Sequence, residues 1–332
     1  MKEEDIRPKK IFDEYLALAE KDVNDYFMNM PFLYVPCPAC NGKNSIFKFK
    51  KFGFDYEECQ NCGTLYVNPR PSAEAFNNYY SDSPSVQFWA TNFYKETESS
   101  RRELIIRPKA ELVKKYLDKY TENLSENSCI IDIGAGYGVF CEELKNILPV
   151  DINIIAIEPS KPLSKICMDK DIVTINKFIE EIKNHDLEGM LVKGAISFEL
   201  FEHLHNPSLF IKKCNEIISP EGLLILTTLT WDGFDLQVLQ DKSDSIHPPH
   251  HINFFTKKSI SLLLEKNGFK ICEIITPGKL DIDIVSKKSS DVSDPFIKKL
   301  IECNSDVKEK FQIFLQEAKL SSHMMVIAKK IN

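Results

Sequence analysis

A short apolar run followed by closely spaced glycines constrains the fold of this chain more than any other feature. The run at 129–133 leads into Asp132-Ile-Gly134-Ala-Gly136-Tyr-Gly138, and further apolar runs follow at 154–157, 173–175, 195–198 and 223–228. Helix-length segments separate these runs. Strands that alternate with helices indicate a parallel sheet built from βαβ units. Two later strands are expected at 270–275 and 324–328, with a helix pair at 295–302 and 306–319 between them.

The glycines indicate a ligand site, because glycine at a strand-to-helix turn lets the backbone approach a ligand closely. A dinucleotide fingerprint would need a third glycine at position 139, where the chain has Val139. The next strand ends in Glu158, whose carboxylate can accept hydrogen bonds from both hydroxyls of a ribose. Taken alone, Glu158 could equally be a solvated carboxylate; beside the glycines it predicts a nucleoside site.

Four of the ten cysteines form two Cys-x-x-Cys pairs, Cys37-Pro-Ala-Cys40 and Cys59-Gln-Asn-Cys62. Such pairs let four thiolates converge on one tetrahedral Zn²⁺, and a site filled by four thiolates is structural. Metal binding would then supply the folding energy of this small module. The alternatives are a rubredoxin-like iron site and four ordinary buried cysteines. The other six cysteines stand singly among apolar residues and are expected in the core.

Several segments together resemble the class I S-adenosylmethionine-dependent methyltransferases. The Asp-x-Gly-x-Gly-x-Gly form is similar to their first motif, and Phe198-Glu-Leu-Phe-Glu202-His203-Leu, with Pro-Glu-Gly-Leu-Leu-Ile-Leu-Thr-Thr at 220–228, is similar to their fourth- and fifth-strand region. The segment Pro249-His-His251-Ile-Asn-Phe-Phe-Thr256 resembles the group that contains ubiquinone-biosynthesis O-methyltransferases and bacterial sugar methyltransferases. The Cys-x-x-Cys-Gly and Asn-Pro-Arg-Pro elements resemble the subset with an N-terminal zinc ribbon. The resemblance is weakest at 1–36 and 279–320.

The resemblance implies a Rossmann-like, seven-stranded mixed sheet whose last strands are antiparallel, with a small zinc ribbon and a helical cap over the active-site edge. The expected division is an N-terminal helix at 1–31, the zinc ribbon at 32–71, a helical linker or cap at 72–122 and a methyltransferase domain at 123–332. A helical insertion is expected within that domain at 280–320. Within the linker, a helix at 95–120 should be interrupted near Pro108.

S-adenosylmethionine is the cofactor that the resemblance implies. Phe178 would pack on adenine, although an ordinary core or helix-face position is an equal alternative. Phe198 and Glu199 would line the floor near the sulfonium, because π faces and acceptors favour a cation. The full set of expected cofactor residues is Asp132, Gly134, Ala135, Gly136, Tyr137, Glu158, Pro159, Phe178, Phe198 and Glu199.

A histidine is expected to take the acceptor's proton, because an imidazole with a pKa near neutrality suits general-base catalysis. His251 is favoured slightly over His203; the alternatives are acceptor binding and orientation of a loop. In some relatives an acid and histidines near the fourth strand hold a divalent ion, so Glu202 and His203 form a further alternative. Arg101, Arg102 and His250 are expected to bind the acceptor, the alternative for the arginines being a solvated helix face.

The acceptor is expected to be a small molecule. By resemblance it is a sugar or nucleotide-sugar, with surface-polysaccharide biosynthesis as the setting. The net charge of −7 disfavours nucleic acid as a partner, so an RNA methyltransferase is the weaker enzyme alternative. A non-catalytic adenosylmethionine-binding protein is the other. No apolar run approaches the roughly 20 residues that span a bilayer, and the charged start lacks the apolar core of a secretory signal. A cytoplasmic location is therefore expected.

Overall fold

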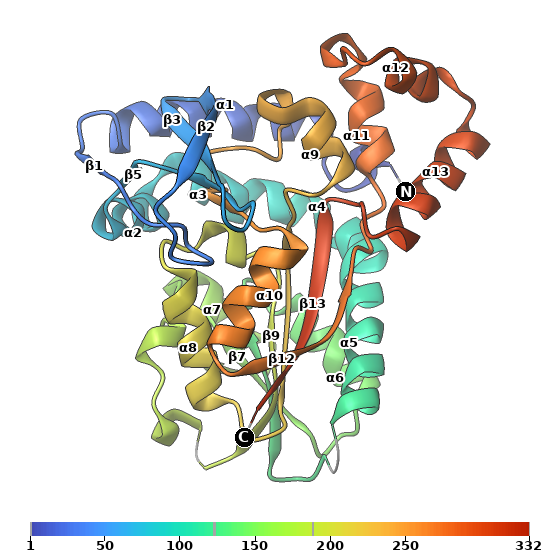
Figure 1. The fold of residues 1–332 in the computed structure, drawn as a ribbon. Coiled ribbons are helices and arrows are strands. Elements are labelled where there is room, and N and C mark those ends of the chain that lie inside the picture. Colours follow the sequence, from blue (N-terminus) through green and yellow to red (C-terminus); the bar gives the residue numbers. More distant parts are fainter. Residues whose placement is uncertain (1, 122–123, 188, 332) are drawn as a thin grey trace.

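The expected strands assemble into one seven-stranded sheet in the computed structural model, which describes residues 2–121, 124–187 and 189–331 (Figure 1). The strand order is β12-β13-β10-β9-β6-β7-β8. The strands are β6 (Ser128–Ile133), β7 (Asn153–Ile157), β8 (Val173–Ile175), β9 (Leu191–Ser197), β10 (Leu223–Leu229), β12 (Phe269–Ile275) and β13 (His323–Lys330). The predicted α/β fold is confirmed.

The prediction that the last strands are antiparallel is correct for β13 but wrong for β12. Strand β13 pairs antiparallel with both β10 and β12, so β12 runs in the same direction as the first five strands. The reason is the connectivity. Helix α10 (Lys257–Lys266) returns the chain to the amino edge before β12 begins, whereas the helical segment after β12 leaves the chain at the carboxyl edge. Strand β13 must therefore run back through the sheet.

Helices cover both faces of this sheet, and the strands alternate between two apolar cores. In β6, Cys129 and Ile131 pack on one side with α8 and α10, whereas Ile130 packs on the other with α5 and α6. This alternation is the two-residue period of a strand. The first face is covered by α8 (Pro207–Ile217) and α10, and the second by α5 (Arg107–Tyr120), α6 (Val139–Ile147) and α7 (Lys161–Asp169). Of the six single cysteines, four are fully buried as expected, namely Cys129, Cys141, Cys167 and Cys214.

The cysteine-bearing segment forms a second, four-stranded sheet in the order β11-β4-β3-β2. Its strands are β2 (Ser45–Lys51), β3 (Phe54–Cys59), β4 (Leu65–Val67) and β11 (Asn253–Phe254). Strand β11 comes from the loop after β10 and pairs antiparallel with β4, so this sheet is completed by residues far along the chain. Helix α1 (Lys9–Tyr26) lies beside it, and β1 (Phe32–Leu33) pairs with β5 (Arg70–Pro71). The expected domain boundaries stay predictions, and the one between 122 and 123 falls outside the described residues.

The segment from 84 to 120 is continuously helical rather than interrupted at Pro108. The five-residue turn η3 (Arg102–Ile106) has the wider π geometry and directly precedes α5, which carries Pro108 in its first turn. Proline has no N–H to donate and clashes with the preceding turn of a regular helix, and the wider turn accommodates both effects. The other segments are α2 (Ala73–Asp82), α3 (Pro84–Phe88), η2 (Trp89–Phe93) and α4 (Tyr94–Arg101).

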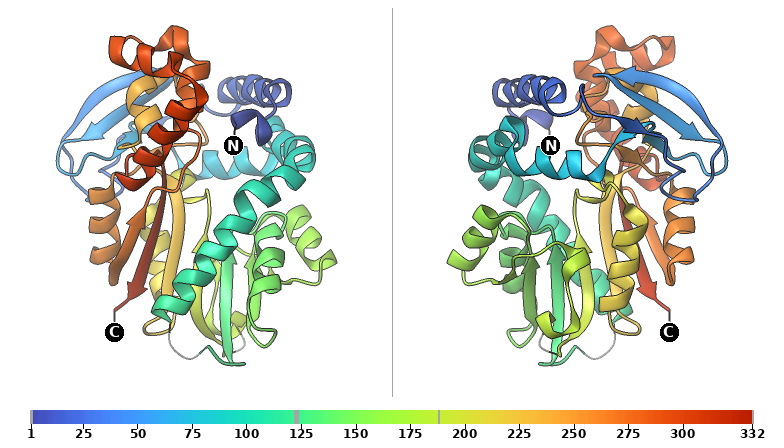
Figure 2. Two further views of the ribbon diagram at one scale, coloured as in Figure 1. Left: turned by 90° about the vertical axis from the view of Figure 1, so that its right-hand side faces the viewer. Right: turned by 90° about the vertical axis from the view of Figure 1, so that its left-hand side faces the viewer.

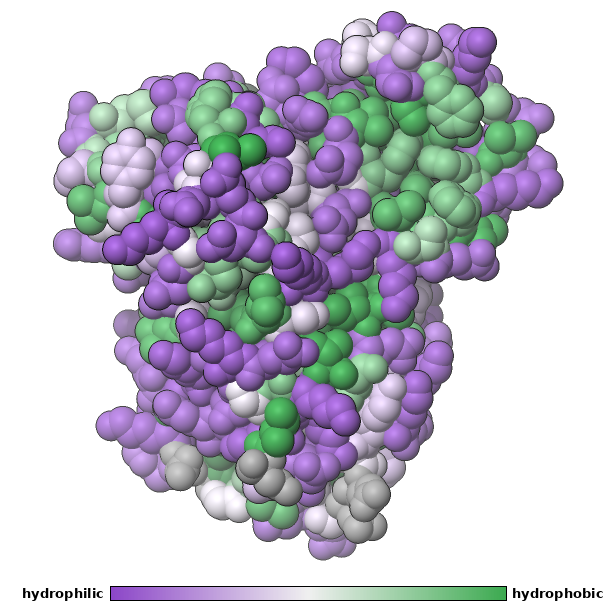
Figure 3. Space-filling view, in the orientation of Figure 1, coloured by the Kyte–Doolittle hydropathy of each residue, from purple (hydrophilic) through white to green (hydrophobic). Residues whose placement is uncertain are grey.

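The C-terminal helices form a separate small core at the carboxyl end of the parallel strands, on the same end of the sheet as α1 and the cysteine segment (Figure 2). They are α9 (Phe234–Leu239), α11 (Asp281–Lys287), α12 (Pro295–Glu302) and α13 (Ser305–Glu317), which confirms the predicted helix pair. Apolar side chains, Phe296 and Phe314 among them, are exposed on these helices (Figure 3). Short turns complete the list: η1 (Glu3–Asp5), η4 (Ile179–Glu181), η5 (Asn184–Leu187), η6 (Phe201–His203), η7 (Gln240–Lys242) and η8 (Ser289–Asp291). Among the described residues, no helix is long and apolar enough to cross a membrane.

Candidate functional site

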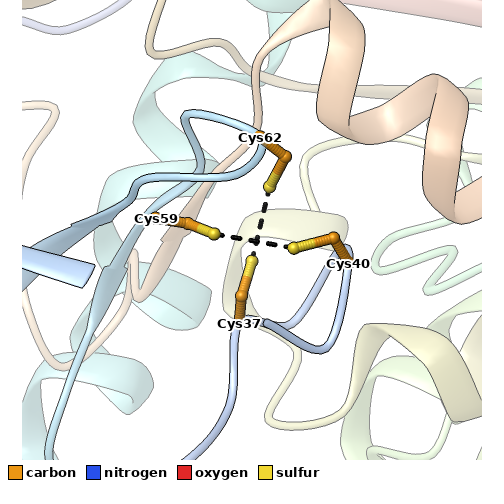
Figure 4. Close-up of side chains that lie close together, drawn as sticks. All are labelled: Cys37, Cys40, Cys59 and Cys62. Carbon is orange, nitrogen blue, oxygen red and sulfur yellow. Dashed lines mark hydrogen bonds between the residues drawn. The ribbon is translucent and has the colours of Figure 1, made fainter. Parts of the chain in front are cut away.

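The four paired cysteines converge on one point (Figure 4). The Sγ atoms of Cys37 and Cys62 lie 3.5 Å apart, as do those of Cys40 and Cys59, and all four lie within 4.8 Å of one another. Sulfurs about 2.3 Å from a tetrahedral zinc are about 3.8 Å apart, and a disulfide would need about 2 Å. The arrangement therefore fits a closed four-thiolate zinc site with no position left for a substrate.

The cysteine segment also holds the loop that carries His251. The buried Tyr56 of β3 donates a hydrogen bond from Oη to the His251 carbonyl at 2.7 Å. Arg70, only 1% exposed, donates from Nη2 to Asn253 Oδ1 at 3.1 Å. Thr256 Oγ1 donates to the Cys62 carbonyl at 3.0 Å. Three contacts thus join the cysteine segment to the 251–256 region, and one of them ends on Cys62 of the candidate metal site.

The glycine-rich loop and Glu158 lie together at the carboxyl edge of the sheet. Gly134, Gly136 and Gly138 all have positive φ, a region that favours glycine. Glu158 accepts hydrogen bonds from the backbone N–H groups of Gly136 and Ser160, each at 2.8 Å. Each carboxylate oxygen has further lone pairs, so both can still accept ribose hydroxyls. Burial raises the pKa of Glu158 and raises that of Asp132 to about 7.

The other expected cofactor residues surround this loop. Tyr137 stacks on Tyr94 of α4 with ring centroids 4.2 Å apart, which places α4 over the glycine loop. Phe178 follows β8 and is 53% exposed, so it is not a core residue and remains available to a ligand. Pro159 and Ala135 flank the same carboxyl edge, because they directly follow Glu158 and Gly134.

Phe198 and Glu199 are already engaged by residues of the protein. The ammonium of Lys109 lies 4.8 Å from the centroid of the Phe198 ring and 2.7 Å from Glu199 Oε1. His323 Nε2 lies 2.9 Å from Glu199 Oε2, and Thr227 Oγ1 donates to Glu199 Oε1 at 2.7 Å. Burial raises the pKa of Glu199, but His323 and Lys109 outweigh it and hold that pKa well below its usual value. A protein cation therefore lies at the floor that was expected to face the sulfonium.

His203 and His251 meet Glu202 at the same edge. The two imidazoles are 4.8 Å apart and nearly perpendicular, and ligand atoms of all three residues lie within 4.8 Å of one another. His251 Nδ1 donates to the carbonyl of Ser245 at 2.6 Å, which leaves Nε2 as the ring nitrogen with a lone pair. His203 Nδ1 lies 3.2 Å from Tyr80 Oη. The pair can accept a proton, and with Glu202 it could hold a divalent cation.

Burial sets the charge of this group. It lowers the pKa of His251 to about 4 and that of His203 to about 3, and it raises the pKa of Glu202 to about 8. At neutral pH both imidazoles are therefore uncharged, and their lowered pKa values make them weaker bases than an exposed histidine. The Glu202 carboxyl, which also accepts a hydrogen bond from Thr228 Oγ1 at 3.0 Å, is largely protonated.

Three candidate acceptor-binding residues remain, and they differ in whether they already have partners within the described part of the protein. His250 is buried, and its Nε2 lies 2.6 Å from Tyr79 Oη. Arg102 pairs with three carboxylates, those of Glu98, Glu142 and Glu143. Among the described residues Arg101 forms no ion pair, and its Nε is buried without a hydrogen-bond partner. The ion pairs give Arg102 a structural task, whereas Arg101 is free to meet a ligand; acceptor binding by Arg101, Arg102 and His250 stays a prediction.

Comparison with known proteins identifies the family. A family model described as a methyltransferase domain matches residues 101–274, more than half of the chain. The chain belongs to this family. The ubiquinone biosynthesis O-methyltransferase of Bradyrhizobium diazoefficiens is 26% identical over 134 residues, 36% of this chain and 50% of that protein. That of Bartonella tribocorum is 22% identical over 155 residues, 42% of this chain and 63% of that protein. This methyltransferase-family chain thus spans about half the length of the first curated relatives it matches.

Solved structures of methyltransferases are also similar. An S-adenosylmethionine-dependent methyltransferase from Clostridium acetobutylicum is 10% identical, with a TM-score of 0.47 over 73% of this chain and 100% of that one. The plantazolicin methyltransferase BpumL in complex with SAH is 16% identical, with a TM-score of 0.49 over 77% and 93%. The family expected from the sequence is confirmed by the family model.

Three residues of the site were not predicted from the sequence. Lys109 and His323 bind Glu199, and Tyr94 stacks on the glycine loop. Lys109 and His323 carry no local signal, because each lies far along the chain from Glu199. Tyr94 lies close to Phe88, Trp89 and Phe93 in the sequence, but only the path of α4 shows what the Tyr94 ring contacts.

Proposed function

We propose that this protein transfers the methyl group of S-adenosylmethionine to a small acceptor, with His251 as the general base. The observation that supports this most is the hydrogen bond from His251 Nδ1 to the Ser245 carbonyl. It selects the tautomer whose Nε2 carries the free lone pair, and it does so beside the carboxyl edge where the glycine loop and Glu158 lie. Open α/β sheets bind ligands at that edge.

The cofactor proposal rests on the loop of Gly134, Gly136 and Gly138 and on the carboxylates of Asp132 and Glu158. Adenosylmethionine would supply an electrophilic methyl on a sulfonium. The protein's part would be to hold the ribose on Glu158 and the methionine portion over the glycine loop. The exposed Phe178 would then be available to cover the adenine. Phe198 and Glu199 would contact the cofactor next to the ammonium of Lys109, which already contacts both.

The acceptor proposal is a hydroxyl of a sugar or nucleotide-sugar, in the cytoplasm and with surface-polysaccharide biosynthesis as the setting. A base with a free Nε2 suits a hydroxyl, which must lose a proton as it attacks. The named curated relatives are O-methyltransferases, which also favours oxygen as the methylated atom. Net charge of −7 continues to argue against a nucleic-acid acceptor. The four thiolates would hold one structural zinc.

A second arrangement of the same residues rests on the proximity of Glu202, His203 and His251. A divalent cation held there would bind the acceptor hydroxyl and lower its pKa, and His251 would then be a ligand instead of a base. Brief treatment with EDTA distinguishes the two, provided that the zinc content is measured afterwards. Unchanged turnover with zinc retained supports the base; loss that Mg²⁺ or Mn²⁺ restores supports the cation.

A radiolabelled-methyl screen across nucleotide-sugars, glycans, phenols and RNA tests the overall proposal. Single-turnover transfer to the acceptor it identifies then tests the base in His251→Asn and His203→Asn. A general base contributes about 10²–10⁴-fold in rate, so His251→Asn should lose that factor with adenosylmethionine affinity unchanged. Wild-type rates in both variants across pH 6 to 9 would exclude both histidines as the base. A loss in His203→Asn alone would assign the base to His203.

A further inference from the structure

Two arginines near the candidate active site, Arg7 and Arg101, have guanidinium groups without hydrogen bonds to the described part of the chain. The Nε atom of each is buried and unpaired. The Nη atoms also lack hydrogen bonds but are not buried, so they remain accessible to a ligand. A partly desolvated guanidinium without a partner costs free energy, and an anion on its accessible nitrogens offsets that cost. The pair therefore has the properties of an anion-binding group.

The two arginines approach each other beside the proposed general base. Arg7 lies over the ring of Phe12 at 5.4 Å, and Phe12 packs at 6.0 Å on Phe93, which directly precedes α4. The N-terminal turn accordingly lies beside the helical segment that contains α4 (Figure 2). Burial lowers the pKa of Arg101, and the charge of Arg7 lowers it further. Burial is also the main cause of the lowered pKa of His251, to which the charge of Arg7 contributes. Arg7 thus lies close to both groups.

Contacts with α11 hold the segment that carries Arg7. The backbone N–H of Glu3 donates to Asp283 Oδ2 at 2.9 Å, and the Glu3 carboxylate lies 3.3 Å from the ammonium of Lys287. Ile6 is only 3% exposed. Arg7 follows it directly, so the position of this arginine depends on the packing of the N-terminal turn against the C-terminal helices.

Helix α4 directs Arg101 toward the carboxyl edge of the sheet. Arg101 follows Tyr94 by seven residues, which is close to two helical turns, so both lie on one face of α4. Thr97 of the same face is 1% exposed, and Tyr94 stacks on Tyr137 of the glycine loop. The charge of Glu199 raises the pKa of Arg101 against the effect of burial. Arg101 therefore lies between the glycine loop and the end of β9.

The carboxylates near these arginines are already shared with other cations. Lys109 and His323 contact the two oxygens of Glu199 at 2.7 and 2.9 Å. Glu3 lies 3.7 Å from Arg7, but a lysine of α11 is closer to it at 3.3 Å. Positive charge therefore remains in excess at this position, although the net charge of the chain is −7. Two guanidinium groups match the charge of a phosphate or diphosphate better than that of a single carboxylate.

We propose that Arg7 and Arg101 together bind the phosphate or diphosphate group of the acceptor. The inference rests on the proposed function and deepens it, because the acceptor would then be a sugar phosphate or a nucleotide-sugar. The Nη atoms donate to the phosphate oxygens, as arginine does in bidentate contacts. The bound anion neutralises the pair and holds the acceptor next to His251. A neutral sugar would leave both charges uncompensated.

Calorimetric titration with pyrophosphate, without divalent cations, tests the proposal on the full-length protein saturated with S-adenosylhomocysteine. Arg7→Gln and Arg101→Gln each remove one of the two charges. Lys10→Gln and Lys95→Gln remove an exposed charge from α1 and α4 and are the matched controls. We expect pyrophosphate to bind wild type and both controls, and each arginine variant to bind it about tenfold or more weakly, since charge-assisted hydrogen bonds are lost. Zinc content and S-adenosylhomocysteine affinity should be equal in all five proteins.

Uridine diphosphate and glucose 1-phosphate serve as further probes. Tighter binding of the first identifies a nucleotide-sugar and tighter binding of the second a sugar phosphate, and either result supports the proposal if the arginine variants weaken it.

Three outcomes would overturn the proposal. The first is that pyrophosphate fails to bind, or binds the arginine variants as tightly as wild type. The second is tighter binding of glucuronate than of every phosphate, which would assign the pair to a carboxylate. The third is weaker S-adenosylhomocysteine binding in the arginine variants with unchanged pyrophosphate affinity, which would assign the pair to the cofactor. S-adenosylhomocysteine binding by wild type is measured first; its absence would count against the proposed function, and the free protein would then be titrated with pyrophosphate.

Discussion

Tyr56→Phe removes one hydroxyl and tests whether the four-cysteine segment positions the His251 loop. The side chain is fully buried, and its Oη is the donor to the His251 carbonyl at 2.7 Å. Phenylalanine keeps the ring packing but leaves that carbonyl unpaired. The loss of such a bond costs about 1–3 kcal/mol, which should lower the local opening free energy of 251–254 by the same amount. Amide exchange there should become about 5- to 150-fold faster.

Hydrogen-exchange mass spectrometry over 244–256 measures this effect without any acceptor. Tyr66→Phe is the control, because Tyr66 is a buried tyrosine of the same sheet whose hydroxyl has no hydrogen bond to this loop in the described part of the chain. Exchange at 251–254 that is no faster in Tyr56→Phe than in Tyr66→Phe would refute the coupling. Once an acceptor is known, Tyr56→Phe should also slow single-turnover transfer on the order of 10- to 100-fold, since small misplacements are that costly.

Three further predictions concern the metal, the cofactor and pH. Elemental analysis should find one zinc per chain, and Cys37→Ser with Cys62→Ser should abolish it; metal content unchanged by both would contradict the site. Glu158→Ala should weaken adenosylmethionine binding by about 2–4 kcal/mol, on the order of 30- to 1000-fold, and unchanged affinity by calorimetry in a folded variant would exclude the ribose role. Burial lowers the pKa of His247 to about 3, so below about pH 6.5 this histidine binds more protons in the unfolded chain than in the folded one. The raised pKa values of the buried Asp132 and Glu202 carboxyls act in the opposite direction, so the histidine's effect is measured by difference. The stability of wild type relative to His247→Asn should fall from pH 6.5 to pH 4, by up to about 1.4 kcal/mol per pH unit, and a difference in urea midpoint that stays constant between pH 7 and pH 5 would contradict this.

The sequence predicts the structure correctly where a pattern of neighbouring residues specifies an element. The strands of the main sheet lie within a few residues of the apolar runs, because a buried strand needs consecutive apolar residues to fill both cores. The two wrong predictions concern the direction of a strand in the sheet and the geometry of a helix. The direction of β12 depends on how α10 returns the chain, and the helix through Pro108 depends on a π turn. Neither feature can be predicted from a short segment of the sequence.

By itself, the sequence determined the α/β alternation, the glycine turn beside Glu158 and the spacing of four cysteines, because each depends on residues close together in the chain. Only the tertiary structure decided which groups act on the candidate catalytic side chains. Lys109 reaches Glu199 across 90 residues, and Tyr56 reaches His251 across 195. The free nitrogen of His251 likewise depends on where the Ser245 carbonyl lies. Such partners follow from where the chain returns after folding, and a hydrogen bond of that kind has no counterpart in local spacing.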